Sequence, residues 1–204
     1  MSYIVTGGCG FIGSNFVNYL LSTTDQDIIV VDCLTYAGKP GNIKWTDKAR
    51  LVEYDITVPG TLDDLLEHND VDGIFHFAAE THVDNSIVGP TQFVQTNVVG
   101  TFNILESIRK HGDCRLLHIS TDEVYGALSQ DSPSFLETKM LEPNNVYSAT
   151  KAGSDLLVRS YNKTFDLDVV TTRCCNNFGP RQDTEKLLPK VISNALNDEP
   201  IPVY

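Results

Sequence analysis

The sequence lacks a long apolar run and lacks paired cysteine motifs. A membrane helix needs about 18 consecutive apolar residues, and no stretch approaches that length. The five cysteines are odd in number, show no CxxC spacing, and include the adjacent pair Cys174 and Cys175. Neither a disulfide framework nor a zinc site is expected from this pattern, and no metal site is predicted. No signal-like segment follows Met1, so we expect a cytoplasmic protein with reduced thiols and no membrane contact.

Basic residues are also few. Lys and Arg number 15 against 27 Asp and Glu, which gives a formal net charge of −12. A chain this acidic repels phosphate backbones, so general nucleic-acid binding is not expected, although one anionic ligand in a local pocket is compatible with it. The apolar content of 41% and the charged content of 21% are ordinary for a globular protein and exclude a disordered tail.

Short β-branched runs alternate with amphipathic stretches along the chain. Continuous apolar runs are typical of parallel strands covered on both faces, and their alternation with helices is typical of βαβ units. The sequence therefore predicts an α/β fold with a doubly wound parallel sheet and helices on both faces. Strands are expected at 2–6, 28–32, 50–54, 73–77, 116–120 and 169–172, helices at 11–21, 62–67, 91–109, 147–163 and 187–196, and a long loop at 127–145.

A glycine-rich turn joins the first expected strand to the first expected helix. Gly7, Gly10 and Gly13 have GxxGxxG spacing. These positions suit a tight turn, a close approach of a pyrophosphate, and close helix–strand packing, while the helix N-terminus offers N–H groups to phosphates. The second strand ends at Asp32, whose carboxylate can accept hydrogen bonds from a ribose diol and would repel a 2′-phosphate. The pattern favours NAD over NADP.

Tyr147 and Lys151 lie four residues apart near the start of an expected helix, on one helix face. A tyrosine with a pKa of about 10 is a poor base at neutral pH, and a nearby ammonium is expected to lower that pKa. The pair could then remove a hydroxyl proton while hydride leaves the same carbon for a nicotinamide. Alone, this spacing would indicate a helix-surface pair, but it follows a dinucleotide signature here.

Six longer segments make the sequence similar to the extended short-chain dehydrogenase/reductase family and, within it, to the dTDP-glucose 4,6-dehydratases. These segments are 6–15, 32–38, 76–87, 96–101, 120–126 and 173–180. The resemblance covers essentially the whole chain and implies a Rossmann-like NAD-binding domain at 1–180, followed at 181–204 by the start of a smaller substrate domain. Members of the family are longer, so we expect a fragment that stops within a strand at Tyr204 and is inactive by itself.

The block Thr121-Asp122-Glu123 separates dehydratases from epimerases in this resemblance, because epimerases usually carry small hydroxylated or apolar residues in place of the two acids. The resemblance implies that Tyr147, with Lys151 and Thr121, deprotonates the sugar C4 hydroxyl while hydride passes from C4 to NAD⁺. Glu123 then removes the C5 proton, Asp122 protonates the departing C6 hydroxyl, and hydride returns to C6. An isolated Asp-Glu pair would instead be interpreted as a solvated turn.

The resemblance also assigns residues to two ligands. Besides the glycines, Asp32, Tyr147 and Lys151, the expected cofactor contacts are Phe11, Ile12, Leu34, Thr35, Asp55, Ile56, Ala78, Ala79, Thr96 and Asn177. With dTDP-glucose as the implied substrate, the expected substrate contacts are Thr81, His82, Thr121, Asn176, Lys186, Leu187, Pro202, Val203 and Tyr204. His82 could instead cap a loop, and Lys186 could be a surface charge.

Relatives dimerise through the helices at 91–109 and 147–163, so a homodimer is expected, and rhamnose is the usual destination of the product. Two alternatives stay open: another NAD-dependent sugar-nucleotide enzyme, such as an epimerase or decarboxylase, and a non-catalytic dinucleotide-binding module.

Overall fold

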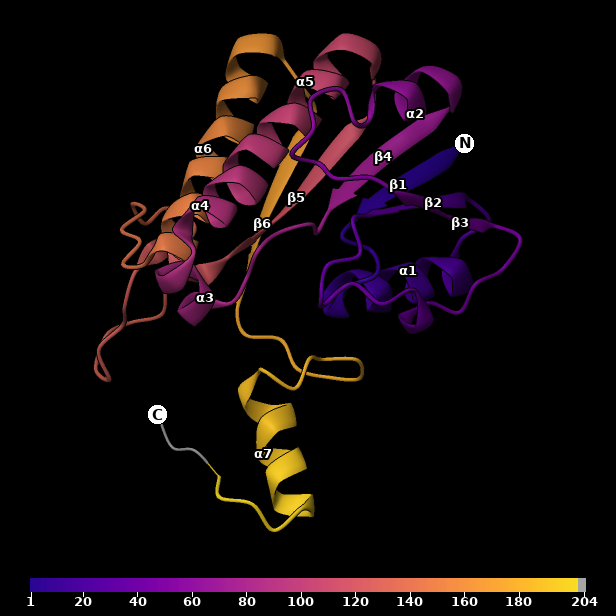
Figure 1. Cartoon of the computed structure of the whole chain (residues 1–204). Helices are drawn as coiled ribbons and strands as arrows, with labels where there is room; N and C mark the ends of the chain where they lie inside the picture. Colours follow the sequence, from indigo (N-terminus) through magenta and orange to yellow (C-terminus); the bar gives the residue numbers. More distant parts are fainter. Residues whose placement is uncertain (202–204) are drawn as a thin grey trace.

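The computed structural model describes residues 1–201 and contains a six-stranded parallel sheet (Figure 1). The strands are β1 Ser2–Thr6, β2 Asp27–Asp32, β3 Ala49–Glu53, β4 Val71–His76, β5 Arg115–Thr121 and β6 Val169–Cys174. Their order is β3-β2-β1-β4-β5-β6. All six predicted strands are confirmed, with small shifts at their ends. The order reverses between β1 and β4, and ligands bind at such a switch point, outside the carboxyl ends of the strands.

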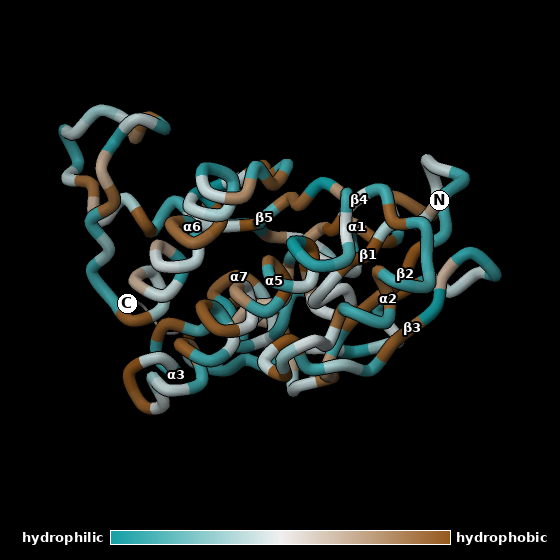
Figure 2. Tube along the Cα trace, turned by 90° about the horizontal axis from the view of Figure 1, so that it is seen from above, coloured by the Kyte–Doolittle hydropathy of each residue, from teal (hydrophilic) through white to brown (hydrophobic). Residues whose placement is uncertain are grey.

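Helices cover both faces of this sheet, as predicted for a Rossmann-like fold. On one face lie α2 Asp63–His68, α5 Thr101–His111 and α6 Val146–Phe165, whereas α1 Phe11–Thr23 lies on the other (Figure 1). Successive strand residues alternate between the two layers: Ile4 joins the core beneath α2, α5 and α6, and Val5 joins the core beneath α1. In Figure 2 brown stretches follow the strands, and teal follows many outer loops.

The predicted continuous helix at 91–109 is wrong in one respect, because its middle is a π-helix. The structure has α4 Pro90–Phe93, η2 Val94–Gly100 and then α5. Within η2 the carbonyl of Asn97 accepts a hydrogen bond from Thr101 Oγ1 over 2.7 Å. A Cβ on Gly100 would lie 2.6 Å from Ile56 Cδ1, so this turn packs tightly on the loop after β3. Apolar spacing alone cannot reveal such a local widening.

Three further short helices were not predicted: η1 Pro40–Asn42, α3 Val83–Val88 and η3 Asp122–Tyr125. His82 is the N-cap of α3, where its side chain accepts from the Asn85 N–H. Each of these helices has at most six residues, too few to establish a hydrophobic periodicity.

The remaining predicted elements are confirmed. Residues 127–145 form a long loop without helix or strand, and α7 Leu187–Leu196 is a helix set apart from the sheet (Figure 1). No residue of α7 is buried. The domain boundary at 180 remains a prediction. Within residues 1–201, no helix has both the length and the apolar character that a membrane span requires. All five cysteines are free thiols.

Candidate active site

A pocket of about 750 Å³ opens at the carboxyl ends of the strands. It is lined by segments from every predicted motif. The predicted site residues that line it are Gly7, Gly10, Phe11, Ile12, Gly13, Asp32, Thr35, Asp55, Ile56, Ala78, Ala79, Thr81, Thr96, Thr121, Glu123, Tyr147, Lys151, Asn176, Asn177 and Lys186. Leu34, His82, Asp122 and Leu187 are not among the lining residues. The predicted contacts Pro202, Val203 and Tyr204 lie outside the described residues.

The glycine-rich turn has the geometry expected of a phosphate cradle. Gly7 has a φ of +66°, and a Cβ there would lie 2.5 Å from the Ala78 nitrogen. A Cβ on Gly13 would overlap the Gly7 carbonyl oxygen, so a side chain at that position would push α1 off the turn. Gly10 caps α1 without a side-chain hydrogen bond, and the first turn of α1 carries no acidic residue. The N-terminal N–H groups of α1 are therefore available to an anion in the pocket.

Asp32 connects the glycine-rich turn to the loop after β2. Its Oδ2 accepts from the Cys9 N–H over 2.9 Å, and its Oδ1 accepts from the Leu34 N–H over 2.9 Å. A Cβ on Gly38 would lie 2.6 Å from Oδ1, so a side chain at this position would displace the carboxylate. A carboxylate has about four lone-pair sites, so two remain for a ligand. Leu34 itself packs against the core beneath α1.

Tyr147 and Lys151 are both buried in the first turns of α6, at 9% and 3% exposure. Lys151 Nζ donates a hydrogen bond to the Ile119 carbonyl over 2.8 Å. Burial lowers the pKa of Lys151 to about 8, against the opposing effects of Asp155 and Cys174.

The prediction that Tyr147 has a lowered pKa is wrong for this arrangement. Burial raises the pKa of its phenol, Glu123 raises it further, and the hydrogen bond from Thr121 lowers it only in part. Desolvation of the phenolate thus outweighs the nearby donors. Ionising Tyr147 requires additional positive charge beside its oxygen.

The predicted catalytic block Thr121-Asp122-Glu123 lies at the end of β5: Thr121 is the last residue of the strand, and Asp122 and Glu123 begin η3. Thr121 Oγ1 accepts from the Glu123 N–H over 3.2 Å, and Glu123 lines the pocket. Both Glu123 and Asp122 act electrostatically on Tyr147. Asp122 hydrogen-bonds the side chain of Cys175 and raises the pKa of that thiol. The structure therefore brings both acids near Tyr147, with Glu123 alone of the two lining the pocket.

Glu185 and Lys186, just before α7, line the pocket and are held there by polar contacts. Tyr36 Oη donates to Glu185 Oε1 over 3.3 Å, and His82 Nε2 lies 3.7 Å from Glu185 Oε2. Lys186 Nζ donates to the Thr81 carbonyl over 3.3 Å. These contacts hold Lys186 over the site, whereas Leu187 begins α7 and is 54% exposed.

The sequence reasoning missed several residues in or beside the site, of which three polar ones bear on its geometry. Glu80 lines the pocket, and burial, together with Glu185, raises its pKa. Asn97 binds both backbone groups of Glu80, with distances of 2.9 and 3.0 Å. Asn145 caps α6 in a capping box. Only Asn145 carried a readable signal, an Asn-x-x-Ser pattern just before an amphipathic stretch.

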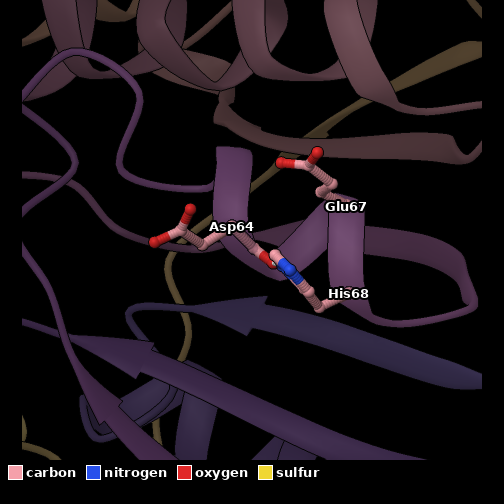
Figure 3. Close-up of side chains that lie close together, drawn as sticks. All are labelled: Asp64, Glu67 and His68. Carbon is pink, nitrogen blue, oxygen red and sulfur yellow. Dashed lines mark hydrogen bonds between the residues drawn. The ribbon is translucent and has the colours of Figure 1, made fainter.

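One group of possible metal ligands occurs in the part of the chain that the structure describes. Asp64, Glu67 and His68 lie on α2 and are all exposed (Figure 3). His68 Nδ1 lies 2.9 Å from the Asp64 carbonyl oxygen, so one ring nitrogen is already engaged. None of the three lines the pocket at the strand ends. This exposed cluster is therefore separate from the candidate active site.

Comparison with known proteins agrees with the geometry. The family described as GDP-mannose 4,6 dehydratase matches residues 4–204. The low-salt glycan biosynthesis protein Agl12 of Haloferax volcanii is 52% identical, across 100% of this chain and 66% of that protein. The dTDP-glucose 4,6-dehydratase of Mycolicibacterium smegmatis is 46% identical, across 96% of this chain and 59% of that protein. The chain thus spans less than two thirds of the length of these relatives.

A solved structure shows the same arrangement. DesIV, the dTDP-glucose 4,6-dehydratase of Streptomyces venezuelae solved with NAD bound, superposes with a TM-score of 0.94 at 47% identity, across 100% of this chain and 65% of that one. On these grounds the chain belongs to the GDP-mannose 4,6-dehydratase family.

Proposed function

We propose that this chain forms the cofactor-binding and acid–base part of an NAD-dependent dTDP-glucose 4,6-dehydratase, a hydro-lyase. The reaction oxidises C4 of the sugar, removes water across C5 and C6, and leaves a 4-keto-6-deoxy sugar nucleotide. DesIV, which this chain resembles over its whole length, is described as that enzyme.

The residues present fit NAD. The bare N-terminus of α1 at Gly10 suits the pyrophosphate, and Asp32 retains lone pairs for a ribose diol. Asp55 and Ile56 line the same pocket and would contact the adenine. When bound, NAD supplies the carbon that accepts hydride and later returns it.

Side chains of this protein carry out the proton transfers of the proposed reaction. Tyr147 accepts the proton of the C4 hydroxyl; Thr121 hydrogen-bonds its oxygen, and Lys151 lies one turn further along α6. Glu123 removes the C5 proton, which the C4 ketone acidifies, and Asp122 protonates the departing C6 hydroxyl. When hydride returns to C6, Glu123 gives its proton back to C5. Because burial disfavours the phenolate, a bound oxidised nicotinamide would supply positive charge that favours ionisation of Tyr147.

The strongest support for a dehydratase is the position of two adjacent carboxylic acids, Asp122 and Glu123, at the end of β5 beside Tyr147. Dehydration needs both an acid and a base in one cleft. The two acids argue against an epimerase, because epimerisation removes no water. The buried Tyr147–Lys151 pair argues against a non-catalytic module, because burying an amine costs stability.

The test uses the protein encoded by the full reading frame, with Glu123→Gln compared against Glu142→Gln. Glu142 sits in the exposed loop and pairs with Lys139 over 3.3 Å. Glu123→Gln is expected to reduce both C5 proton exchange and dehydration of dTDP-glucose by at least about 100-fold. Glu142→Gln should leave both rates near those of the parent. Unchanged turnover in Glu123→Gln would overturn the assignment.

Three finer points rest on the same proposal. The exposed apolar residues Phe102 on α5 and Leu156 on α6, two helices that lie side by side in Figure 1, are consistent with a homodimer. The free thiols are consistent with a cytoplasmic enzyme. Rhamnose synthesis is the proposed destination of the product.

Sedimentation analysis of the full-length protein tests the proposed homodimer: a monomer would contradict it.

A further inference from the structure

A buried polar cluster lies directly behind the Tyr147–Lys151 pair, between α6 and the sheet. Its members come from β5, η3, α6 and β6, and they are His118, Tyr125, Ser154, Asp155 and Arg173. The side chains of His118 and Asp155 are 0% and 2% exposed, and that of Arg173 is 24% exposed. The acid–base steps proposed above use none of these residues.

The contacts within the cluster converge on Asp155. Arg173 Nε donates to Asp155 Oδ2 over 2.8 Å, and Arg173 Nη1 donates to Tyr125 Oη over 2.7 Å. His118 Nε2 lies 3.3 Å from Asp155 Oδ1 and 3.2 Å from Ser154 Oγ. Among the described residues, Asp155 Oδ1 has no hydrogen-bond partner of good geometry. One oxygen of this carboxylate is therefore bound by Arg173, while the other has the looser contact with His118.

The charges in the cluster can be assigned. Burial lowers the pKa of His118 to about 4, so the ring is neutral at pH 7 and its contact with Asp155 is not an ion pair. Burial alone would raise the pKa of Asp155, but its contacts with His118, Arg173 and Ser120 outweigh that effect and lower it. Asp155 is thus a buried carboxylate at neutral pH.

Lys151 is the other buried charge in this region. Asp155 follows it by four residues on α6, so the two side chains occupy the same helix face one turn apart. The ionisable groups coupled electrostatically to Lys151 are Asp155 on α6, Cys174 on β6, His76 on β4 and His118 on β5. Of the carboxylates, Asp155 is the one whose charge opposes the loss of the Lys151 proton.

We propose that Asp155 is the buried counter-charge of Lys151 and thereby a positioning residue for the Tyr147–Lys151 pair, a role that rests on the proposed function. Asp155 acts through Lys151 and does not touch the substrate. Its negative charge keeps Lys151 as an ammonium ion at neutral pH, in the form that can stabilise the phenolate of Tyr147. A buried amine without a counter-charge would lose its proton.

Arg173 connects Asp155 to the turn that carries Asp122 and Glu123. Its guanidinium joins Asp155 to the phenol of Tyr125, which is the last residue of η3. Because η3 also carries Glu123, one partly buried cation links the helix that bears Lys151 to the turn that bears the proposed C5 base. The arrangement sets these two groups relative to one another.

The test is a direct NMR titration of the Lys151 Cε signal in the lysine-labelled protein, with Lys151→Met identifying the signal. Asp155→Asn is expected to lower the Lys151 midpoint from about 8 by one unit or more, at least about a ten-fold rise in its acid dissociation constant. A purely structural role would loosen the site, admit water, and move the midpoint upward, toward 10.5. An unchanged or raised midpoint overturns the proposal. Because no substrate or turnover is involved, a wrong reaction assignment would not alter this outcome.

Two controls complete the experiment. Asp168→Asn removes an exposed carboxylate that pairs with Arg115 over 2.7 Å, and it should leave the midpoint unchanged. If Asp155→Asn does not fold, the double variant Asp155→Asn/Lys151→Met decides the question, because it removes the uncompensated buried amine. A double variant that folds supports the pairing, and one that fails to fold contradicts it.

Discussion

Asn145 Nδ2 donates a hydrogen bond to Glu123 Oε2 over 3.3 Å, so the residue that caps α6 also holds the proposed C5 base. The Oδ1 atom of the same Asn145 accepts from the Ser148 N–H over 2.8 Å, as an N-cap does. One amide thus fixes the position of Glu123 relative to the first turn of α6, where Tyr147 lies. This relationship couples the stability of a helix end to the geometry of the site.

The two roles of Asn145 can be separated by substitution. Asn145→Ala should lower the free energy of unfolding by about 1 kcal/mol and also reduce turnover, because both hydrogen bonds are lost. Asn145→Ser should retain most of the stability, since serine is a good N-cap, yet still reduce turnover because it cannot reach Glu123. Urea unfolding and a dehydration assay measure the two effects. Equal turnover in Asn145→Ser and the parent would contradict a role in holding Glu123.

Gly13 tests the glycine-rich turn. Gly13→Ala should lower the free energy of unfolding by about 1–3 kcal/mol and weaken NADH binding, because the new methyl group meets the Gly7 carbonyl and shifts α1. Gly41→Ala is the matched control, because nothing lies within 4 Å of the added carbon. Thermal unfolding and fluorescence titration with NADH check both variants. If the two behave alike, close packing at Gly13 is not what the turn requires.

Lys151 predicts a pH dependence of stability. Its pKa is about 8 in the folded protein and near 10.5 when exposed, so the unfolded chain binds more protons between these values. Stability should therefore rise as the pH increases from 8 toward 10.5, by on the order of 3 kcal/mol over the whole window. Other groups titrate there too, so the comparison is with Lys151→Met. The parent should gain stability relative to this variant between pH 8 and pH 9.5; a constant difference would show that burial does not lower the pKa of Lys151.

Asp32 should set the choice of cofactor. Because like charges in contact cost several kcal/mol, the protein is expected to bind NADH on the order of 100-fold more tightly than NADPH. Asp32→Ala should bring this ratio close to one, and it should weaken both affinities because the Cys9 and Leu34 N–H groups lose their acceptor. Asp27→Ala, an exposed residue at the start of the same strand, serves as control. Retained discrimination in Asp32→Ala would place the specificity elsewhere.

Much of the fold was predictable because its signals are local. The apolar runs around Ile4 and Ile29 mark strands buried on both faces, and Gly7 to Gly13 mark a strand–turn–helix junction. The π-helix at Val94–Gly100 was not predictable, because apolar spacing does not distinguish a π-helical turn from an α-helical one.

Some contacts in the site were predictable from sequence spacing, and others were not. Tyr147 and Lys151 share one helix turn, so their pairing follows from their spacing. The Asp155–Arg173 contact joins residues 18 apart, and the His118–Ser154 contact joins residues 36 apart. No periodicity encodes such contacts, because sheet order and helix placement create them. The direction of the Tyr147 pKa was missed for the same reason: burial depends on the assembled core, and it outweighs nearby donors.

In the proposed reaction, hydride leaves C4 and returns to C6 of one sugar nucleotide. An isotope experiment follows this transfer: the full-length protein receives dTDP-glucose deuterated at C4, without added NAD, and NMR locates the label in the product. We expect a 4-keto-6-deoxy product with deuterium at C6. Deuterium retained at C4 of a sugar with inverted configuration would contradict the dehydratase proposal and would indicate an epimerase.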